Sequence, residues 1–151
     1  MKTFQTLSEL AACTGQEVAV SDWTTITQQQ VDLFAEATGD RQWIHVDPEK
    51  ARAGPFGGPV AHGFLTLSLL PRFFESSFEI LGSRLGVNYG LNKVRFTAPV
   101  LVGSRLRARM KLLATEPIDN AGLQMTWQVT VEREGADKPV CVAESLVRRY
   151  S

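Results

Sequence analysis

The sequence predicts a single α+β domain in which a curled antiparallel sheet wraps around a central apolar helix. Two observations lead to this fold class. The C-terminal half contains four strand-like segments, and a helix-like segment at residues 61–74 is apolar on nearly every side. Antiparallel strands with one apolar face need a cover, and an apolar helix needs surfaces that bury it. With 151 residues and no visible linker or repeat, residues 1–151 are expected to form one domain.

The first predicted helix has clear signals at both ends. Thr27 and Gln30 have the spacing of a capping box, and Gly39 stands where a helix is expected to stop. The sequence therefore predicts a helix over residues 28–38. The turn-rich stretch at residues 39–59 follows, and a loop of this length in a compact domain usually has a binding role.

The second helix, at residues 61–74, is expected to lie buried on all sides because its apolar residues leave no polar face. Pro71 lacks a backbone N–H and is expected to kink or shorten this helix.

The four long strands are expected at residues 87–98, 105–112, 123–131 and 140–147, with a hairpin turn at residues 135–139 before the last of them. In the second strand apolar residues alternate with Arg105, Arg107, Arg109 and Lys111. Such a charged row is usually a solvated face of a sheet.

Composition excludes several functional classes. Lys plus Arg number 16 and Asp plus Glu number 16, so the chain lacks the basic excess of nucleic-acid-binding proteins. Cys13 and Cys141 have no metal or redox spacing, and no metal site is predicted. No signal peptide is visible, and the apolar run at residues 64–70 is too short to cross a bilayer. We therefore expect a cytoplasmic protein with no membrane or nucleic-acid partner.

The most informative motif follows the first helix. The segment GDRQWIH at residues 39–45 resembles the Gly-Asp-x-Asn-Pro-aliphatic-His signature of the MaoC-like, R-specific enoyl-CoA hydratases. The segment GPVAHGF at residues 58–64 resembles the stretch that opens the central helix of that family. One departure is plain, because Gln42-Trp43 replaces Asn-Pro, and this form is most similar to the nodulation-protein-N-like branch.

The resemblance implies a hot-dog fold and an activity that adds water to, or removes it from, an acyl thioester. That reaction needs a base for water, an acid for the α-carbon and a donor for the enolate oxygen. The family pattern implies that Asp40 and His45 form the acid–base pair, with either one as the base. It also implies that the backbone N–H of Gly63 binds the thioester oxygen.

Other side chains were considered as substrate contacts. Trp43, His62, Asn88 and Tyr89 are candidates to line the acyl pocket. Part of the basic row, or Lys93 and Arg95, could contact the phosphates of coenzyme A, which enters only as part of the substrate. No other cofactor is implied.

Each candidate also has a purely structural interpretation. Asp40 after Gly39 could be an ordinary turn residue, and His45 between two aliphatic residues could be a half-buried structural histidine. His62 is expected to have mainly a structural role at the start of the helix. The Asp40–His45 spacing ahead of an apolar helix is what favours catalysis.

Two other functions stay open on the sequence. A hot-dog thioesterase would use an acidic residue and the same helix start, but it usually places the carboxylate on or beside the central helix, which here has none before Glu75. A noncatalytic acyl-thioester-binding subunit would have the same fold without turnover. The acyl-CoA partner and a homodimer or higher homo-oligomer are expectations from the resemblance and from the open sheet edge.

Overall fold

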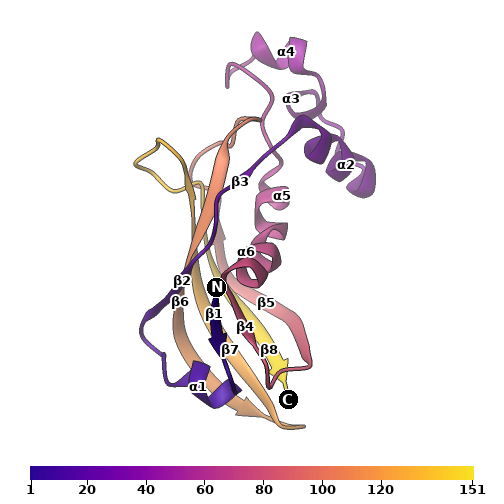
Figure 1. The fold of residues 1–151 in the computed structure, drawn as a ribbon. Helices are drawn as coiled ribbons and strands as arrows, with labels where there is room; N and C mark the ends of the chain where they lie inside the picture. Colours follow the sequence, from indigo (N-terminus) through magenta and orange to yellow (C-terminus); the bar gives the residue numbers. More distant parts are fainter.

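A six-stranded antiparallel sheet forms most of the molecule (Figure 1). The computed structural model describes residues 1–151. The strand order is β2-β6-β7-β8-β5, and β3 also pairs with β6. The strands are β2 (Glu17–Val20), β3 (Thr24–Thr25), β5 (Leu85–Arg95), β6 (Arg105–Ile118), β7 (Gly122–Arg133) and β8 (Cys141–Tyr150).

The four predicted long strands are confirmed. Strands β6, β7 and β8 pair as consecutive hairpins, and β5 does not pair with the next strand in the sequence. Strand β5 returns to the far edge of the sheet and pairs with β8, with Leu85 opposite Tyr150. The predicted alternation also holds, because the apolar residues of β6 and β7 are buried and their neighbours are not. One face of the sheet is therefore the core face.

A second, two-stranded sheet was not predicted. Strands β1 (Lys2–Phe4) and β4 (Phe78–Ile80) pair in parallel, and helix α1 (Leu7–Ala11) follows β1. Three-residue strands are too short to show an alternation pattern, so their sequence carries no reliable signal.

Helix α2 (Gln28–Thr38) matches its prediction. The Thr27 hydroxyl accepts a hydrogen bond from the Gln30 N–H at 3.1 Å, which caps the first turn. Gly39 ends the helix with a φ of 82°, a left-handed conformation that glycine adopts without strain. The chain is thereby turned sharply just before Asp40.

The central helix consists of two segments, α5 (Gly63–Ser68) and α6 (Leu70–Ser77), which both lie against the core face. The break falls at Leu69, and Pro71 lies in the first turn of α6, where a missing N–H costs no hydrogen bond. The expectation of burial on all sides is wrong. Phe64 is 69% exposed, because the helix covers one face of the sheet and its outer side stays open.

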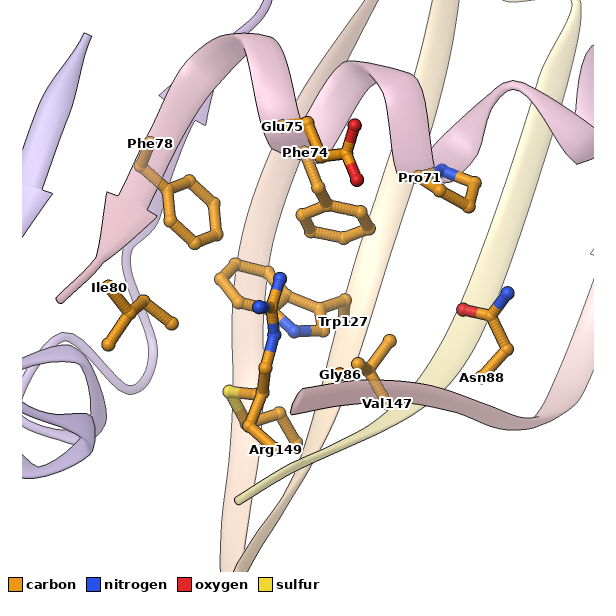
Figure 2. Close-up of a pocket in the computed structure, with 11 residues that line it drawn as sticks. Pro71, Phe74, Glu75, Phe78, Ile80, Gly86, Asn88, Trp127, Val147 and Arg149 are labelled. Atoms are coloured by element: carbon orange, nitrogen blue, oxygen red, sulfur yellow. The ribbon is translucent and has the colours of Figure 1, made fainter. Parts of the chain in front are cut away.

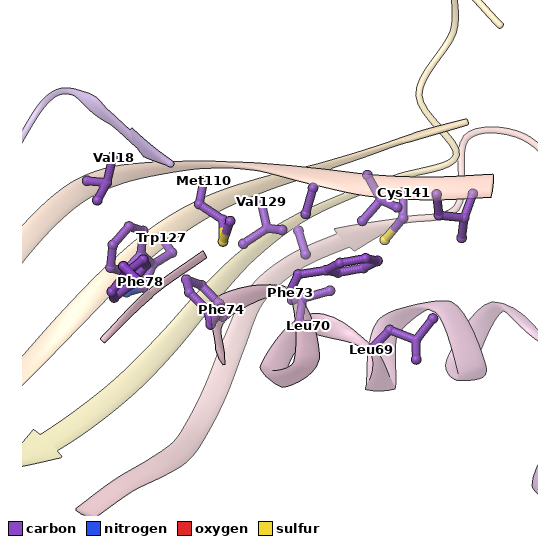
Figure 3. Close-up of a cluster of buried hydrophobic side chains, with 14 of the residues drawn as sticks. Val18, Leu69, Leu70, Phe73, Phe74, Phe78, Met110, Trp127, Val129 and Cys141 are labelled. Atoms are coloured by element: carbon purple, nitrogen blue, oxygen red, sulfur yellow. The ribbon is translucent and has the colours of Figure 1, made fainter. Parts of the chain in front are cut away.

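Aromatic side chains join the helix to the sheet in the core (Figure 3). Phe74 of α6 packs edge-on against Trp127 of β7 with ring centroids 5.1 Å apart, and Phe78 stacks on the same indole at 5.6 Å. Such aromatic pairs contribute about 1 kcal/mol each beyond the apolar area that they bury. They fix the position of α6 over β7.

The predicted loop at residues 39–59 contains two short helices, α3 (Trp43–Val46) and α4 (Pro48–Arg52). Together with α2 they cluster beyond one end of the sheet, next to the start of α5 (Figure 1). The carbonyl of Ile44 accepts a bond from the Val60 N–H at 3.0 Å, which ties α3 to the chain entering α5. None of the helices has the length and apolar character needed to traverse a bilayer.

Candidate active site

Asp40, His45 and His62 meet where α3 approaches the start of α5. One side-chain ligand atom from each residue lies within 4.8 Å of the other two. Asp40 is exposed, whereas both histidines are buried. The Asp40 carboxylate accepts a bond from the Gln42 N–H at 3.4 Å, as in an Asx turn. The structure thus brings together the two residues predicted as the acid–base pair.

The ring of His45 is held by main-chain groups. Its Nδ1 lies 2.6 Å from the Val60 carbonyl oxygen, which can only accept, so Nδ1 carries the proton. In the neutral ring the lone pair therefore lies on Nε2. The Gln28 side chain donates to the His45 carbonyl at 2.8 Å and fixes the backbone from the other side. His45 is presented as a base with a defined tautomer.

His62 contacts Asp40 and His45 but does not line the cavity that His45 lines. Its Nε2 donates to the Asp40 carbonyl oxygen at 2.9 Å, and its ring stacks on that of His45 with centroids 3.8 Å apart. Phe34 of α2 packs on the His62 ring at 4.8 Å. The Nδ1 atom of His62 is buried without a hydrogen-bond partner. The predicted substrate contact is thus a residue that holds the Asp40 turn.

These three side chains are close enough to be considered as metal ligands, but their orientation does not suit one ion. The rings of His45 and His62 are inclined by only 23°, and imidazole lone pairs lie in the ring plane. Lone pairs of two stacked rings run side by side and do not converge. One nitrogen of each ring is also bonded to a backbone carbonyl. The geometry fits proton transfer better than chelation.

His45 and Gly63 line the same cavity, which has a volume of about 350 Å³. Thr66 and Phe96 line it as well, and most of its other walls are apolar. The cavity therefore places a free imidazole nitrogen next to the start of α5 in a largely apolar setting. Asp40 does not line the cavity itself, although its carboxylate lies within 4.8 Å of a ring nitrogen of His45.

Gly63 is the first residue of α5. The first hydrogen bonds of the helix run from Leu65 and Thr66 to the His62 carbonyl, so the Gly63 N–H precedes the helical ladder. A Cβ atom at position 63 would lie 3.0 Å from the Phe96 ring, which is tighter than ordinary contact. A side chain at this position would require the Phe96 ring, which packs over the helix start, to shift by a few tenths of an ångström. The predicted donor is therefore available at the cavity wall.

The other predicted substrate contacts lie elsewhere. Trp43 packs against the backbone of Gly54 and under the Lys50 ammonium, which lies 4.8 Å from the ring centroid. It does not line the cavity of His45. Asn88 and Tyr89 line a second cavity of about 340 Å³ further along the central helix. The structure does not bring them to the acid–base pair.

Sequence reasoning missed four residues of the site: Gln28, Val60, Thr66 and Phe96. Val60 acts through its carbonyl, so no side-chain type could have revealed it. Thr66 is a buried polar residue in an otherwise apolar helix, and that contrast was a usable signal.

The basic row on β6 is paired with acidic residues on neighbouring strands. Arg105 contacts Glu134 at 2.6 Å, while Arg107 and Arg109 both contact Glu132, at 2.8 and 2.5 Å. This supports the interpretation of a solvated face. Lys93 and Arg95 line a different hollow with Glu144, away from His45.

The fold is that of a hot-dog protein, and at the start of its central helix a carboxylate lies beside two histidines. A model of the MaoC like domain matches residues 9–134, and the chain belongs to the MaoC-like family. The 3-hydroxyacyl-thioester dehydratase Z of Mycobacterium tuberculosis is 58% identical over 148 residues, 98% of each chain. Nodulation protein N of Rhizobium leguminosarum bv. viciae is 45% identical, over 91% of this chain and 86% of its own.

Solved structures agree on the fold. The R-hydratase PhaJ1 from Pseudomonas aeruginosa aligns with a TM-score of 0.69 at 25% identity, over 91% of this chain and 82% of its own. A MaoC-like dehydratase from Rhodospirillum rubrum aligns with a TM-score of 0.75 at 23% identity, over 96% of each chain. The predicted hot-dog architecture and the predicted family are confirmed.

Proposed function

We propose that this protein is a hydro-lyase that interconverts trans-2-enoyl thioesters and 3-hydroxyacyl thioesters, with R stereochemistry. The observation that carries the proposal is the orientation of the His45 ring, whose Nδ1–H donates to the Val60 carbonyl and whose Nε2 has no hydrogen-bond partner. The similarity to a 3-hydroxyacyl-thioester dehydratase over nearly the whole chain supports it. Likeness to an R-hydratase supports the stereochemistry.

In the hydration direction, His45 Nε2 takes a proton from a water molecule that also contacts Asp40. The water oxygen bonds to the β-carbon, and the electron pair of the double bond moves toward the thioester oxygen. The Gly63 N–H stabilises the resulting enolate, an interaction of a kind worth about 3 kcal/mol in other oxyanion holes. The proton taken from water returns to the α-carbon, so the reaction balances without a redox group.

The thioesterase alternative fits the structure less well. The central helix carries no carboxylate until Glu75, which is exposed near the end of α6. The carboxylate that approaches the helix start is Asp40, which lies within 4.8 Å of His45. That arrangement supports the addition of water to a double bond.

We also propose that two copies of the chain associate through β5. This strand pairs with β8 on one side only, and its other edge is free. Four large apolar side chains of β5 are exposed, namely Leu85, Val87, Tyr89 and Leu91. A long apolar edge is normally covered, and a second copy of the same edge is self-complementary. Tyr89→Glu should convert the dimer to a monomer in light scattering.

Coenzyme A is the proposed acyl carrier and the cytoplasm the proposed compartment. Cys13 and Cys141 are free, as reducing conditions require. Burial raises the pKa of the Cys141 thiol to about 11, so this residue is protonated and unreactive at neutral pH.

The direct test follows the absorbance of the conjugated thioester when the protein meets crotonyl-CoA, with free thiol measured in the same sample. Loss of absorbance without thiol release, absent in Asp40→Asn, is the expected result. Thiol release would identify a thioesterase. Full activity in Asp40→Asn would refute the site, and chiral analysis of the product tests the R configuration.

A further inference from the structure

Three cavities follow one another along the central helix, and we call this row the helix–strand groove. The second and third lie between the helix and strands β5 and β8, and the first lies beyond the ends of those strands. The first contains Gly63 and Thr66, the second Leu67 and Pro71, and the third Pro71 and Glu75. On the other side of the row, each cavity is lined by a residue further along the chain than the last. Val140, which precedes β8, lines the first cavity, Ser145 lines the second, and Val147 and Arg149 line the third. The second and third cavities share Pro71 and Asn88. The first and second share no lining residue, but Leu67 of the second directly follows Thr66 of the first, so the row runs along the helix from His45 toward Arg149.

Arg149 is a charged residue on the core-facing row of β8. The residues that precede it in that row are Cys141, Ala143, Ser145 and Val147, of which the first three are buried. The third cavity, of about 190 Å³, is lined by the Arg149 side chain together with Phe74 and Trp127. Figure 2 shows the guanidinium pointing from its strand toward α6, beneath Phe74 and Glu75.

This arginine has no carboxylate partner. The ion pairs of the chain involve Arg105, Arg107 and Arg109, and Arg149 takes part in none of them. Burial lowers its pKa below the ordinary arginine value, and the more distant attraction of Glu75 opposes that shift. A half-buried cation is costly unless an anion or several acceptors compensate it.

The opposite strand makes room for the guanidinium. Gly86 of β5 pairs with Arg149, and a Cβ atom at position 86 would lie 2.9 Å from Arg149 Nε. Any other residue at position 86 would push the side chain out of its present position. The Arg149 guanidinium, which can donate two parallel hydrogen bonds, therefore lines the third cavity without an ion-pair partner.

We propose that Arg149 binds a carboxylate at the far end of the acyl chain, so that ω-carboxyl acyl thioesters form a substrate class of this protein. Guanidinium groups bind carboxylates through two parallel hydrogen bonds, which suits a ligand that ends in this group. The exposed amide of Asn88 lines the same cavity and offers a further donor. This inference rests on the proposed hydratase function, which places the thioester at Gly63.

The length of the groove sets the chain length. Pro71 and Glu75 follow Gly63 by eight and twelve residues, which at 1.5 Å per residue is at most about 12 to 18 Å, because the central helix breaks at Leu69. An extended chain advances about 1.2 Å per bond, so an acyl chain of roughly ten to fifteen bonds spans the distance. Crotonyl-CoA is far too short to reach Arg149.

The test measures binding and turnover separately. Saturated acyl-CoA thioesters with eight to fourteen carbons, ending in either a carboxylate or a methyl group, are titrated by calorimetry into the wild type and Arg149→Met. Saturated thioesters cannot be hydrated, so this result does not depend on the proposed reaction. Crotonyl-CoA hydration is measured in parallel, and its failure in both proteins would count against the hydratase and not against Arg149.

The wild type should bind a carboxylate-ended thioester at least tenfold more tightly than the methyl-ended one at one of these lengths. Arg149→Met should lose that preference and keep methyl-ended binding within twofold. Arg149→Lys should keep part of the preference, and Glu75→Gln should increase it because a competing carboxylate is removed. Arg72→Met is the matched control, because Arg72 is exposed on α6 and lines none of the three cavities.

Absence of a carboxylate preference at every length in the wild type would overturn the proposal. An equal loss of both ligand types in Arg149→Met would overturn it as well, since it would mean that the arginine only shapes the groove.

Discussion

The polar side chains at the two ends of the helix–strand groove differ in whether they already have a bonding partner within the protein. At one end the ring of His45 is fixed by the Val60 carbonyl, and His62 is fixed by the Asp40 carbonyl. At the other end the guanidinium of Arg149 has no carboxylate within ion-pair distance. Proton transfer needs a group whose orientation is set before the substrate arrives. Recognition of the end of an acyl chain needs a group that has no partner until the ligand binds.

The largest effect is expected at the His45 end. Asp40→Asn and His45→Ala should each lower kcat by about a thousandfold or more, the upper part of the range for general acid–base groups. The double variant should be little worse than either single one, because residues that act as a unit are not additive. Steady-state kinetics with an enoyl-CoA, alongside circular dichroism as a fold control, measures both. Additive losses would mean that the two residues act separately.

A smaller loss is expected when the support of Asp40 is removed. His62→Phe keeps an aromatic ring to stack on His45 but cannot donate to the Asp40 carbonyl. We expect kcat to fall by about tenfold, as for loss of one hydrogen bond, with KM nearly unchanged. His62→Gln can still donate and should restore part of the rate. A rise in KM with unchanged kcat would instead assign His62 to substrate binding.

At the Arg149 end, we expect the same substitution to remove a substrate preference and to increase the stability of the fold. Arg149→Met removes a half-buried charge without a partner and fills the space with an apolar chain, so the free energy of unfolding should rise by about 1 kcal/mol. Urea unfolding of the two proteins at pH 7 provides the comparison. A loss of stability above 2 kcal/mol would show that Glu75 already serves as an adequate partner.

The smallest effect is expected on the outer face of the sheet. Burial tends to raise the pKa of Glu132, but hydrogen bonds from Arg107 and Arg109 outweigh it and lower the pKa below the ordinary value of 4.5. The folded state therefore gains stability above that value and loses it as the pH falls through the lowered pKa. Glu132→Gln should cost less than about 1 kcal/mol at pH 7, since the pair is partly solvated.

The pH dependence sharpens this last test. The stability difference between wild type and Glu132→Gln should shrink as the pH is lowered below 4.5 and should be constant from pH 6 to pH 8. Thermal unfolding across this range, with Glu144→Gln as an acidic control that forms no ion pair, would show it.

The sequence was most informative where the structure depends on local signals. Helix α2 has a hydroxyl cap and a C-terminal glycine, so both of its ends could be predicted. The rows of β6 and β7 alternate cleanly because one face is core and the other is solvent. Asp40 and His45 could be paired because their motif is short and continuous.

Other features depend on contacts between distant segments. The bond between His62 and Asp40 joins residues 22 positions apart, and both partners have ordinary local contexts. Arg149 was not singled out because both rows of β8 begin with small or apolar residues, such as Cys141 and Val142. Its inward direction follows only from the pairing of β8 with β7 and β5. The all-round apolar composition of α5 likewise gave no hint that Phe64 faces outward.

The anchor of His45 is a carbonyl oxygen, and every residue type has one. No substitution at position 60 deletes the acceptor, because only a change in the path of the chain could move it. The backbone path, and not the identity of a neighbouring side chain, therefore determines which ring nitrogen of His45 donates to this carbonyl. Substitutions around His45 should therefore leave its ring orientation unchanged, as long as the backbone leading into α5 follows the same path.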